Sequence, residues 1–206
     1  MSVTQHSPDV PYEITTIDGA FSDADIDVLK AFVIQHSDAA SGVLHPFTAS
    51  PFANGKLLHE RLAAALFAKI SPHLGDLDMH RTWTYTDRAG VRWGLPEPSR
   101  HVFFAAMRPG EHFGIHTDTG SEFEADGEER SKFTALVYLC DDALIGGETQ
   151  FYTDDLVETV RVQPKRGRTL VFDIDRYHKA CPVERGHKAW IGIEIVLTRS
   201  TESGPP

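Results

Sequence analysis

The pattern of residue types changes at His80, and this change limits the possible folds of the chain more than any other feature. From there onward, short runs rich in β-branched and aromatic residues are separated by clusters of Gly, Pro and Asp, which is typical of strands joined by turns. Such a series predicts a sandwich or barrel and disfavours an alternating α/β sheet. The predicted strands are Arg81–Thr86, His101–Met107, Phe133–Cys140, Thr149–Tyr152, Thr169–Phe172 and Trp190–Thr198.

Helical patterns fall in the first third of the chain. Ser22 can cap a helix together with Asp25, and apolar residues follow at helical spacing. A second helix is predicted from about Lys56 to Ile70, with Pro72 just beyond its end. We expect both helices to cover one outer face of the barrel. The apolar positions that define them are Ile26, Leu29, Phe32, Val33, Leu58, Leu62, Leu66 and Ile70.

Length and composition narrow the class of protein. A chain of 206 residues can bury one sizeable core, so we expect one domain, with residues 1–79 as a supporting region and 80–200 as the barrel core. Two cysteines are too few for a disulfide framework, and the formal charge of −10 disfavours a nucleic-acid partner. The chain shows neither an apolar stretch of membrane-spanning length nor an export signal, so the expected location is the cytoplasm, without a membrane partner.

The sequence contains two His-x-Asp triplets, and only one of them has a suitable context. About one such triplet is expected by chance in a chain with 11 histidines. His36 and Asp38 end a helical pattern, where residues two apart face different directions. His116 and Asp118 follow a predicted strand and a turn, and in an extended chain both side chains point to the same face.

A second histidine, His178, follows a later predicted strand and completes a set of ligands. Two histidines and one carboxylate form a facial triad, which suits iron(II) and leaves three coordination positions open. A simpler alternative, a hydrogen-bonded polar residue at a strand end, remains open for each histidine.

An acidic segment follows the His116 triplet directly, at residues 121–130 (SEFEADGEER). Its composition predicts a solvated, mobile loop. Its place directly after the candidate metal ligands also allows a lid over an active site.

At four segments the sequence resembles the prolyl 4-hydroxylase-like branch of the iron(II)/2-oxoglutarate-dependent dioxygenases. They are 108–118 (RPGEHFGIHTD), 133–139 (FTALVYL), 146–152 (GGETQFY) and 178–191 (HKACPVERGHKAWI), in the order of the family. The resemblance implies a mainly β fold, a double-stranded β-helix (jelly roll) with N-terminal supporting helices. It also implies that His116, Asp118 and His178 bind iron(II) and form the catalytic centre.

The same resemblance implies a binding site for 2-oxoglutarate. Lys188, ten residues after His178, would pair with the distal carboxylate of the co-substrate, although a surface lysine of the last strand is the alternative. Tyr138 would donate its hydroxyl to that carboxylate, and Thr149 would line the pocket. Trp190 shares the strand parity of Lys188, so it would either form a wall of the pocket or belong to the core.

The implied activity is hydroxylation of an unactivated C–H bond with dioxygen, with L-ascorbate as a further expected requirement. A carboxylate at Asp118 favours hydroxylation over halogenation, because halogenating relatives have a small residue there. The substrate would be a small molecule, such as a free amino acid, or a peptidyl residue such as proline. Arg108 and Arg176 lie near the triad in sequence and could bind a substrate carboxylate.

Two positions depart from the family pattern, and two other functions remain open. Met107 stands where many relatives have Tyr, and Cys140 where they have Asn. These differences put the substrate in doubt and leave the triad unchanged. One alternative is a jelly-roll protein that binds metal and 2-oxoglutarate without catalysis. Another is a zinc-dependent isomerase or hydrolase, which Lys188 and Tyr138 disfavour because such an enzyme needs no anchor for a 2-oxo acid.

Overall fold

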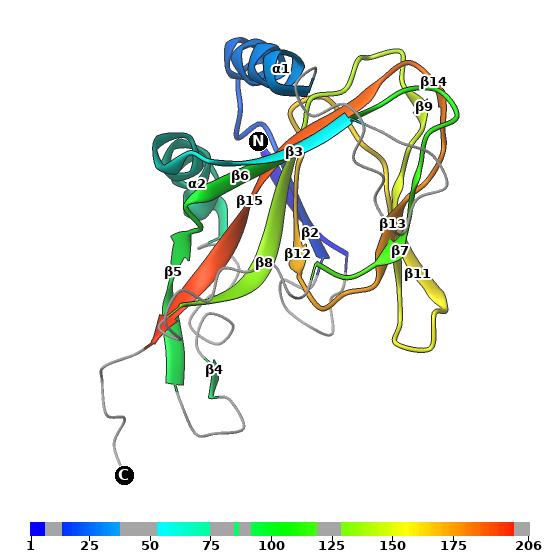
Figure 1. Ribbon diagram of the computed structural model, residues 1–206. Helices are drawn as coiled ribbons and strands as arrows, with labels where there is room; N and C mark the ends of the chain where they lie inside the picture. Colours follow the sequence, from blue (N-terminus) through cyan, green and yellow to red (C-terminus); the bar gives the residue numbers. More distant parts are fainter. Residues whose placement is uncertain (7–13, 38–52, 75–84, 87–91, 119–128, 200–206) are drawn as a thin grey trace.

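The computed structural model describes residues 1–6, 14–37, 53–74, 85–86, 92–118 and 129–199, which form two packed β-sheets, a small β-ribbon and two helices (Figure 1). Within these residues, nine strands form the large sheet. Its main path runs β1-β2-β12-β8-β15-β5-β4, and β6 pairs with both β15 and β3. These strands are β1 (Ser2–Gln5), β2 (Ile14–Asp18), β3 (Ala53–Leu58), β4 (Tyr85–Thr86), β5 (Arg92–Pro98), β6 (His101–Met107), β8 (Glu129–Tyr138), β12 (Thr169–Asp173) and β15 (Lys188–Arg199).

The second sheet faces the large one and carries part of the candidate metal site. In the described residues it has four strands in the order β11-β10-β13-β7, and β14 pairs separately with β9. The bounds of these strands are β7 (Phe113–His116), β9 (Ile145–Gly146), β10 (Thr149–Tyr152), β11 (Glu158–Val162), β13 (His178–Ala180) and β14 (Val183–Arg185).

Strand β15 separates two apolar cores because its side chains alternate between the faces of the sheet. Ile191, Ile193 and Ile195 belong to the core beneath the helices. Trp190 faces the other way and belongs to the core between the two sheets, together with Phe151 of β10. The cavity described below therefore opens between the sheets, on the face of β15 that is turned away from the helices.

Helices α1 (Asp23–Ser37) and α2 (Glu60–Leu74) both pack on β6 and β15, on one face of the large sheet (Figure 1). The cap predicted for α1 is confirmed: the backbone N–H of Asp25 donates to Ser22 Oγ at 3.2 Å, and that of Ser22 donates to Asp25 Oδ2 at 2.8 Å. No helix of the described residues is long and apolar enough to cross a membrane.

The predicted start of the second helix is wrong. Lys56 lies in β3, where it pairs with Phe103 of β6, and α2 begins only at Glu60. His59 precedes the helix, and its carbonyl oxygen accepts from the N–H of Ala63. Pairing with β6 overrides the helical spacing of the leucines. Pro72, expected beyond the helix, lies in its last turn.

The strands predicted after His80 are largely confirmed. The bounds of β6 and β10 agree with the prediction, and β15 begins two residues earlier, so that it includes Lys188. Of the predicted run at 81–86, only the pair that forms β4 lies within the described residues. The acidic segment also lies outside them, except for its last two residues, which begin β8.

Candidate metal and co-substrate site

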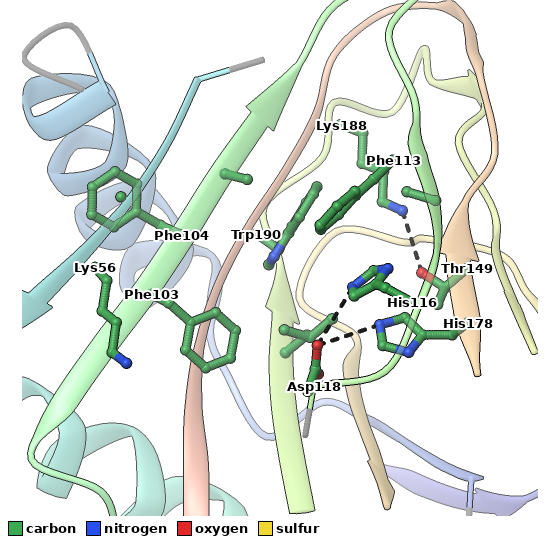
Figure 2. Close-up of a pocket in the computed structure, with 14 residues that line it drawn as sticks. Lys56, Phe103, Phe104, Phe113, His116, Asp118, Thr149, His178, Lys188 and Trp190 are labelled. Atoms are coloured by element: carbon green, nitrogen blue, oxygen red, sulfur yellow. Dashed lines mark hydrogen bonds and ion pairs between the residues drawn. The ribbon is translucent and has the colours of Figure 1, made fainter. Parts of the chain in front are cut away.

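Strand pairing brings the three predicted metal ligands together. His116 ends β7, His178 begins β13, and the two residues are direct partners in the antiparallel pair. Asp118 follows two residues after His116. Its Oδ1 lies 3.5 Å from His116 Nε2 and 3.7 Å from His178 Nε2 (Figure 2). One ligand atom from each residue can be chosen so that all lie within 4.8 Å of one another, which is close enough to share one ion.

Backbone carbonyls orient both imidazoles. His116 Nδ1 lies 2.8 Å from the carbonyl oxygen of Gly114, and His178 Nδ1 lies 2.9 Å from that of Arg176. A carbonyl oxygen only accepts, so each Nδ1 donates its N–H, and Nε2 is the ring atom of each histidine that faces Asp118 and could bind a metal. Metal-binding histidines are held in the same way.

The carboxylate of Asp118 is fixed from behind by Thr134 of β8. Thr134 Oγ1 donates to Asp118 Oδ2 at 2.6 Å. The backbone N–H of Asp118 also donates to the carbonyl oxygen of Ile174 at 2.9 Å. One carboxylate oxygen is thereby occupied, and Oδ1 is left facing the two histidines.

At neutral pH, Asp118 and His178 have the protonation states that a metal requires. Burial acts to raise the pKa of Asp118, but His178, His116 and the Thr134 hydroxyl outweigh it and lower this pKa to about 2. Burial lowers the pKa of His178 to about 4. An ionised carboxylate beside a neutral imidazole is ready to bind a divalent cation.

Lys188 is a second charged residue of the site. It lies buried at one end of the cavity that the triad also lines. Its side chain is 1% exposed, and Nζ lies 3.3 Å from Thr149 Oγ1. The Thr149 hydroxyl is in turn 2.7 Å from the hydroxyl of Tyr138. Nζ also lies 5.2 Å from the ring centroid of Trp190. The resemblance placed these four residues around the co-substrate, and the structure brings them together.

The burial of Lys188 makes it suited to an anionic ligand. Burial lowers the pKa of Lys188 to about 8. Among the ion pairs of the described residues, none joins a carboxylate to Lys188. A buried ammonium without a counter-charge is costly, and the carboxylate of a bound ligand would supply one.

A single cavity of about 240 Å³ joins the triad to Lys188 (Figure 2). Trp190 lines it and also belongs to the core between the sheets, whereas Tyr138 is fully buried behind Thr149 and is not among the described lining residues. The lining consists of Gly55, Lys56, Phe103, Phe104, Ala105, Phe113, His116, Asp118, Leu136, Thr149, His178, Ala180, Lys188 and Trp190.

Neither of the arginines predicted to bind substrate is among the described lining residues. Arg108 is exposed in the turn after β6, where its backbone N–H donates to Glu111 Oε2 at 2.7 Å. Arg176 is half-buried just before β13, and its carbonyl oxygen holds His178. Met107, one of the departures from the family pattern, is fully buried opposite Lys188.

Three residues of the site were not predicted from the sequence. Thr134 supports Asp118, Phe113 stacks on His116 with 3.9 Å between ring centroids, and Lys56 lines the cavity. Strand parity could have identified Thr134, because it lies four residues before Tyr138 on the same face of β8. Lys56 was assigned to a helix, so nothing placed it near the metal ligands.

The sequence profile described as the 2OG-Fe(II) oxygenase superfamily matches residues 102–193. This segment includes all three residues of the triad, together with Tyr138, Thr149 and Lys188. Residues 102–193 belong to the 2OG-Fe(II) oxygenase superfamily. Iron(II) and 2-oxoglutarate are therefore the cofactor and co-substrate of this oxygenase domain, as the resemblance implied. Searches of curated protein sequences gave no match.

Solved structures with the same fold include prolyl hydroxylases. A viral collagen prolyl hydroxylase from Paramecium Bursaria Chlorella virus-1, solved as a 2OG complex, gives a TM-score of 0.60 at 20% identity, covering 92% of this chain and 97% of the viral one. A Pseudomonas putida prolyl-4-hydroxylase gives 0.59 at 14% identity, covering 89% and 92%. A Trichoplax adhaerens prolyl hydroxylase, in complex with a peptide fragment of hypoxia inducible factor, gives 0.57 at 13% identity, covering 89% and 83%. These similarities confirm the expected jelly-roll fold.

Proposed function

We propose that this oxygenase is a hydroxylase in which His116, Asp118 and His178 bind iron(II) and Lys188 anchors 2-oxoglutarate. The observation that carries the proposal is that one cavity joins a 2-His-1-carboxylate set to a buried lysine. The donor set suits iron(II) and leaves adjacent coordination positions open. Bound iron, with 2-oxoglutarate and dioxygen, supplies the oxidising power for hydroxylating an unactivated C–H bond.

The residues of the chain contribute orientation and the exclusion of water. The Nζ atom of Lys188 and the Thr149 hydroxyl would hold the distal carboxylate of 2-oxoglutarate. Tyr138 would keep the Thr149 hydroxyl in place from behind. Trp190 would form an apolar wall of the same compartment. In this arrangement the reacting end of the co-substrate is directed toward the triad.

The substrate proposed for this cavity is a small molecule, such as a free amino acid, or a peptidyl residue such as proline. The fold shared with prolyl hydroxylases supports the peptidyl choice, and the small size of the cavity supports the small molecule. Asp118 occupies the position that a halide ligand would need, which supports hydroxylation. A jelly-roll protein that binds the same ligands without turnover is the alternative, and no feature of the cavity favours it.

Turnover tests the proposal directly. Iron(II), 2-oxoglutarate, L-ascorbate and oxygen are added with panels of free amino acids and of proline-containing peptides. Succinate is quantified, and mass spectrometry looks for a product that has gained one oxygen atom. We expect substrate-dependent succinate from the wild type and none from His178→Ala. An absence of succinate with every substrate, in protein that has bound both iron and 2-oxoglutarate, would support the non-catalytic alternative.

A further inference from the structure

A second lysine, Lys56, lines the cavity at the end away from Lys188. Figure 2 shows Lys56 beside Phe103 on the far side of the cavity from Lys188 and Thr149, with Asp118 toward the opposite wall. Lys56 is exposed, whereas Lys188 is buried. The cavity therefore has a closed, cationic end and an open end that carries a second cation.

Strand register shows that Lys56 faces the cavity because of its place in the sheet. Lys56 of β3 is the direct partner of Phe103 of β6. The row continues across the next two strands, from Phe103 to Gly192 of β15 and from Gly192 to Leu136 of β8. Direct partners in adjacent strands project from the same face of a sheet. Phe103 and Leu136 both line the cavity. Lys56 thus belongs to the row of side chains that forms its floor.

The absence of a side chain at Gly192 lets Phe103 lie flat in this row. A Cβ atom at Gly192 would stand 2.7 Å from ring atoms of Phe103. The Phe103 ring therefore occupies the space above Gly192, between Lys56 and the rest of the floor. This part of the cavity floor is therefore an apolar surface with the ammonium group of Lys56 at its outer edge.

Lys56 is too far along the sheet to share the ligand of Lys188. Lys188 and Gly192 are four residues apart on β15, so their rows are separated by about 13 Å along the strand. Two further strand spacings separate β15 from β3, because β6 lies between them. A five-carbon co-substrate that pairs with Lys188 and chelates the metal cannot also reach Lys56. A carboxylate bound at Lys56 would therefore belong to a different molecule.

The charges of the cavity lining indicate that Lys56 would prefer an anionic ligand. The chain has a formal charge of −10, which opposes the approach of an anion. Apart from the triad, Lys56 and Lys188 are the charged residues among the described lining of the cavity. Burial lowers the pKa of His101 on β6, and the positive charge of nearby Lys56 lowers it further. Among the described lining residues, the charged group at the open end is thus a cation.

We propose that Lys56 binds a carboxylate of the substrate to be oxidised, whose carbon body lies on Phe103 and points toward the metal. The proposal rests on the proposed function and adds a substrate class: apolar acids, either small acids or peptides with a free C-terminal carboxylate. In this assignment Lys56 takes the role that the sequence suggested for Arg108 and Arg176.

Matched acid and amide probes test this class on the anaerobic complex of the protein with iron(II) and 2-oxoglutarate. The first pair is 3-phenylpropanoate and 3-phenylpropanamide. The second is the peptide Ala-Ala-Phe with a free C-terminus and its carboxamide. Binding of each probe is measured by isothermal titration calorimetry. We expect the acid to bind about tenfold more tightly than the amide in at least one pair, because the neutral amide oxygen can still accept from the ammonium but cannot form an ion pair with it.

Variants then assign the preference to Lys56. Lys56→Met should remove the preference for the acid, Lys56→Arg should keep it, and Lys165→Met, at an exposed lysine outside the cavity lining, should behave as the wild type. Equal binding of acid and amide in both pairs, no binding of any acid, or a preference that survives in Lys56→Met would each overturn the proposal. The pair that shows the preference identifies the source of the carboxylate.

The absorption band of the iron–2-oxoglutarate chelate is recorded in every sample before the titration. If the band is missing from the wild type, the proposed function fails. If the band is present in the wild type and in Lys56→Met but no acid is preferred, only the role of Lys56 fails. The two failures are therefore distinguishable.

Discussion

The charge of Lys188 is the residue-scale property on which co-substrate binding most depends. Its pKa is lowered by burial from 10.5 to about 8, so the folded protein binds this proton less tightly than the unfolded chain. Between these two values the unfolded state carries more protons. This group alone therefore makes the ligand-free protein more stable as the pH rises from about 8 to 10.5.

Binding of 2-oxoglutarate should show the opposite dependence on pH. The co-substrate carboxylate pairs with the ammonium form, so its affinity should fall as the pH rises through about 8. We expect the dissociation constant to increase about tenfold between pH 7 and pH 9, measured by calorimetry with iron(II) under anaerobic conditions. Lys188→Met should bind weakly at both pH values. Equal wild-type affinity at pH 7 and pH 9 would show that Lys188 does not hold the carboxylate.

Thr134 provides a second residue-scale prediction, because its hydroxyl fixes one oxygen of Asp118 at 2.6 Å. Thr134→Val keeps the shape of the side chain and removes this hydrogen bond. We expect iron(II) affinity to fall by about 10- to 100-fold, as for other residues that support metal ligands. Thr159→Val, at an exposed position on β11, serves as the control. Unchanged metal affinity in Thr134→Val would mean that Asp118 needs no such support.

At the scale of elements, β15 organises the molecule because it serves the helix side and the cavity side at once. Gly192 in its middle is confined on both sides: an added Cβ would stand 2.7 Å from the carbonyl oxygen of Ala135 and 2.7 Å from the Phe103 ring. A backbone oxygen cannot move aside as a flexible side chain can. The strand therefore requires glycine at this position.

Gly192→Ala should destabilise the protein by about 1–3 kcal/mol, the usual cost of overpacking a core. Urea denaturation followed by circular dichroism measures this change. Ala64→Ser, at an exposed position on α2, should change stability by less than about 0.5 kcal/mol. A Gly192→Ala variant as stable as the wild type would show that β15 and its neighbours separate more easily than this packing implies.

Elements with several buried apolar residues were predictable from the sequence, and short or edge elements were not. β6 and β10 were predicted with the correct bounds, whereas β9, with two residues, carries almost no pattern. The last three residues of β3 were assigned to the second helix because Leu58 falls in register with Leu62, although Leu58 is 66% exposed. The triad and Lys188 were found because family motifs carry them. Lys56 was missed because only the pairing of distant strands brings it to the cavity, whereas the parity of Thr134 with Tyr138 on β8 was not used.

At the scale of the whole molecule, we propose that the chain folds as one domain. Both helices pack on β6 and β15, which also border the cavity, so the N-terminal region and the barrel share a core. Thermal unfolding should therefore give one transition, coincident by circular dichroism and by tryptophan fluorescence. Iron(II) with 2-oxoglutarate should shift that transition upward as a unit. Two separate transitions would contradict a single domain.

In the proposed function, His116, Asp118 and His178 hold an iron ion that 2-oxoglutarate chelates. The most direct measurement is the visible absorption of the protein after anaerobic addition of iron(II) and 2-oxoglutarate. We expect a weak charge-transfer band in the wild type, its loss in His178→Ala, and its retention in His36→Ala. His36 serves as the control because its Nδ1 contacts the carbonyl oxygen of Phe32 within α1, away from the triad. A wild-type protein without the band, or a His178→Ala variant that keeps it, would show that these three residues do not hold the chelated iron.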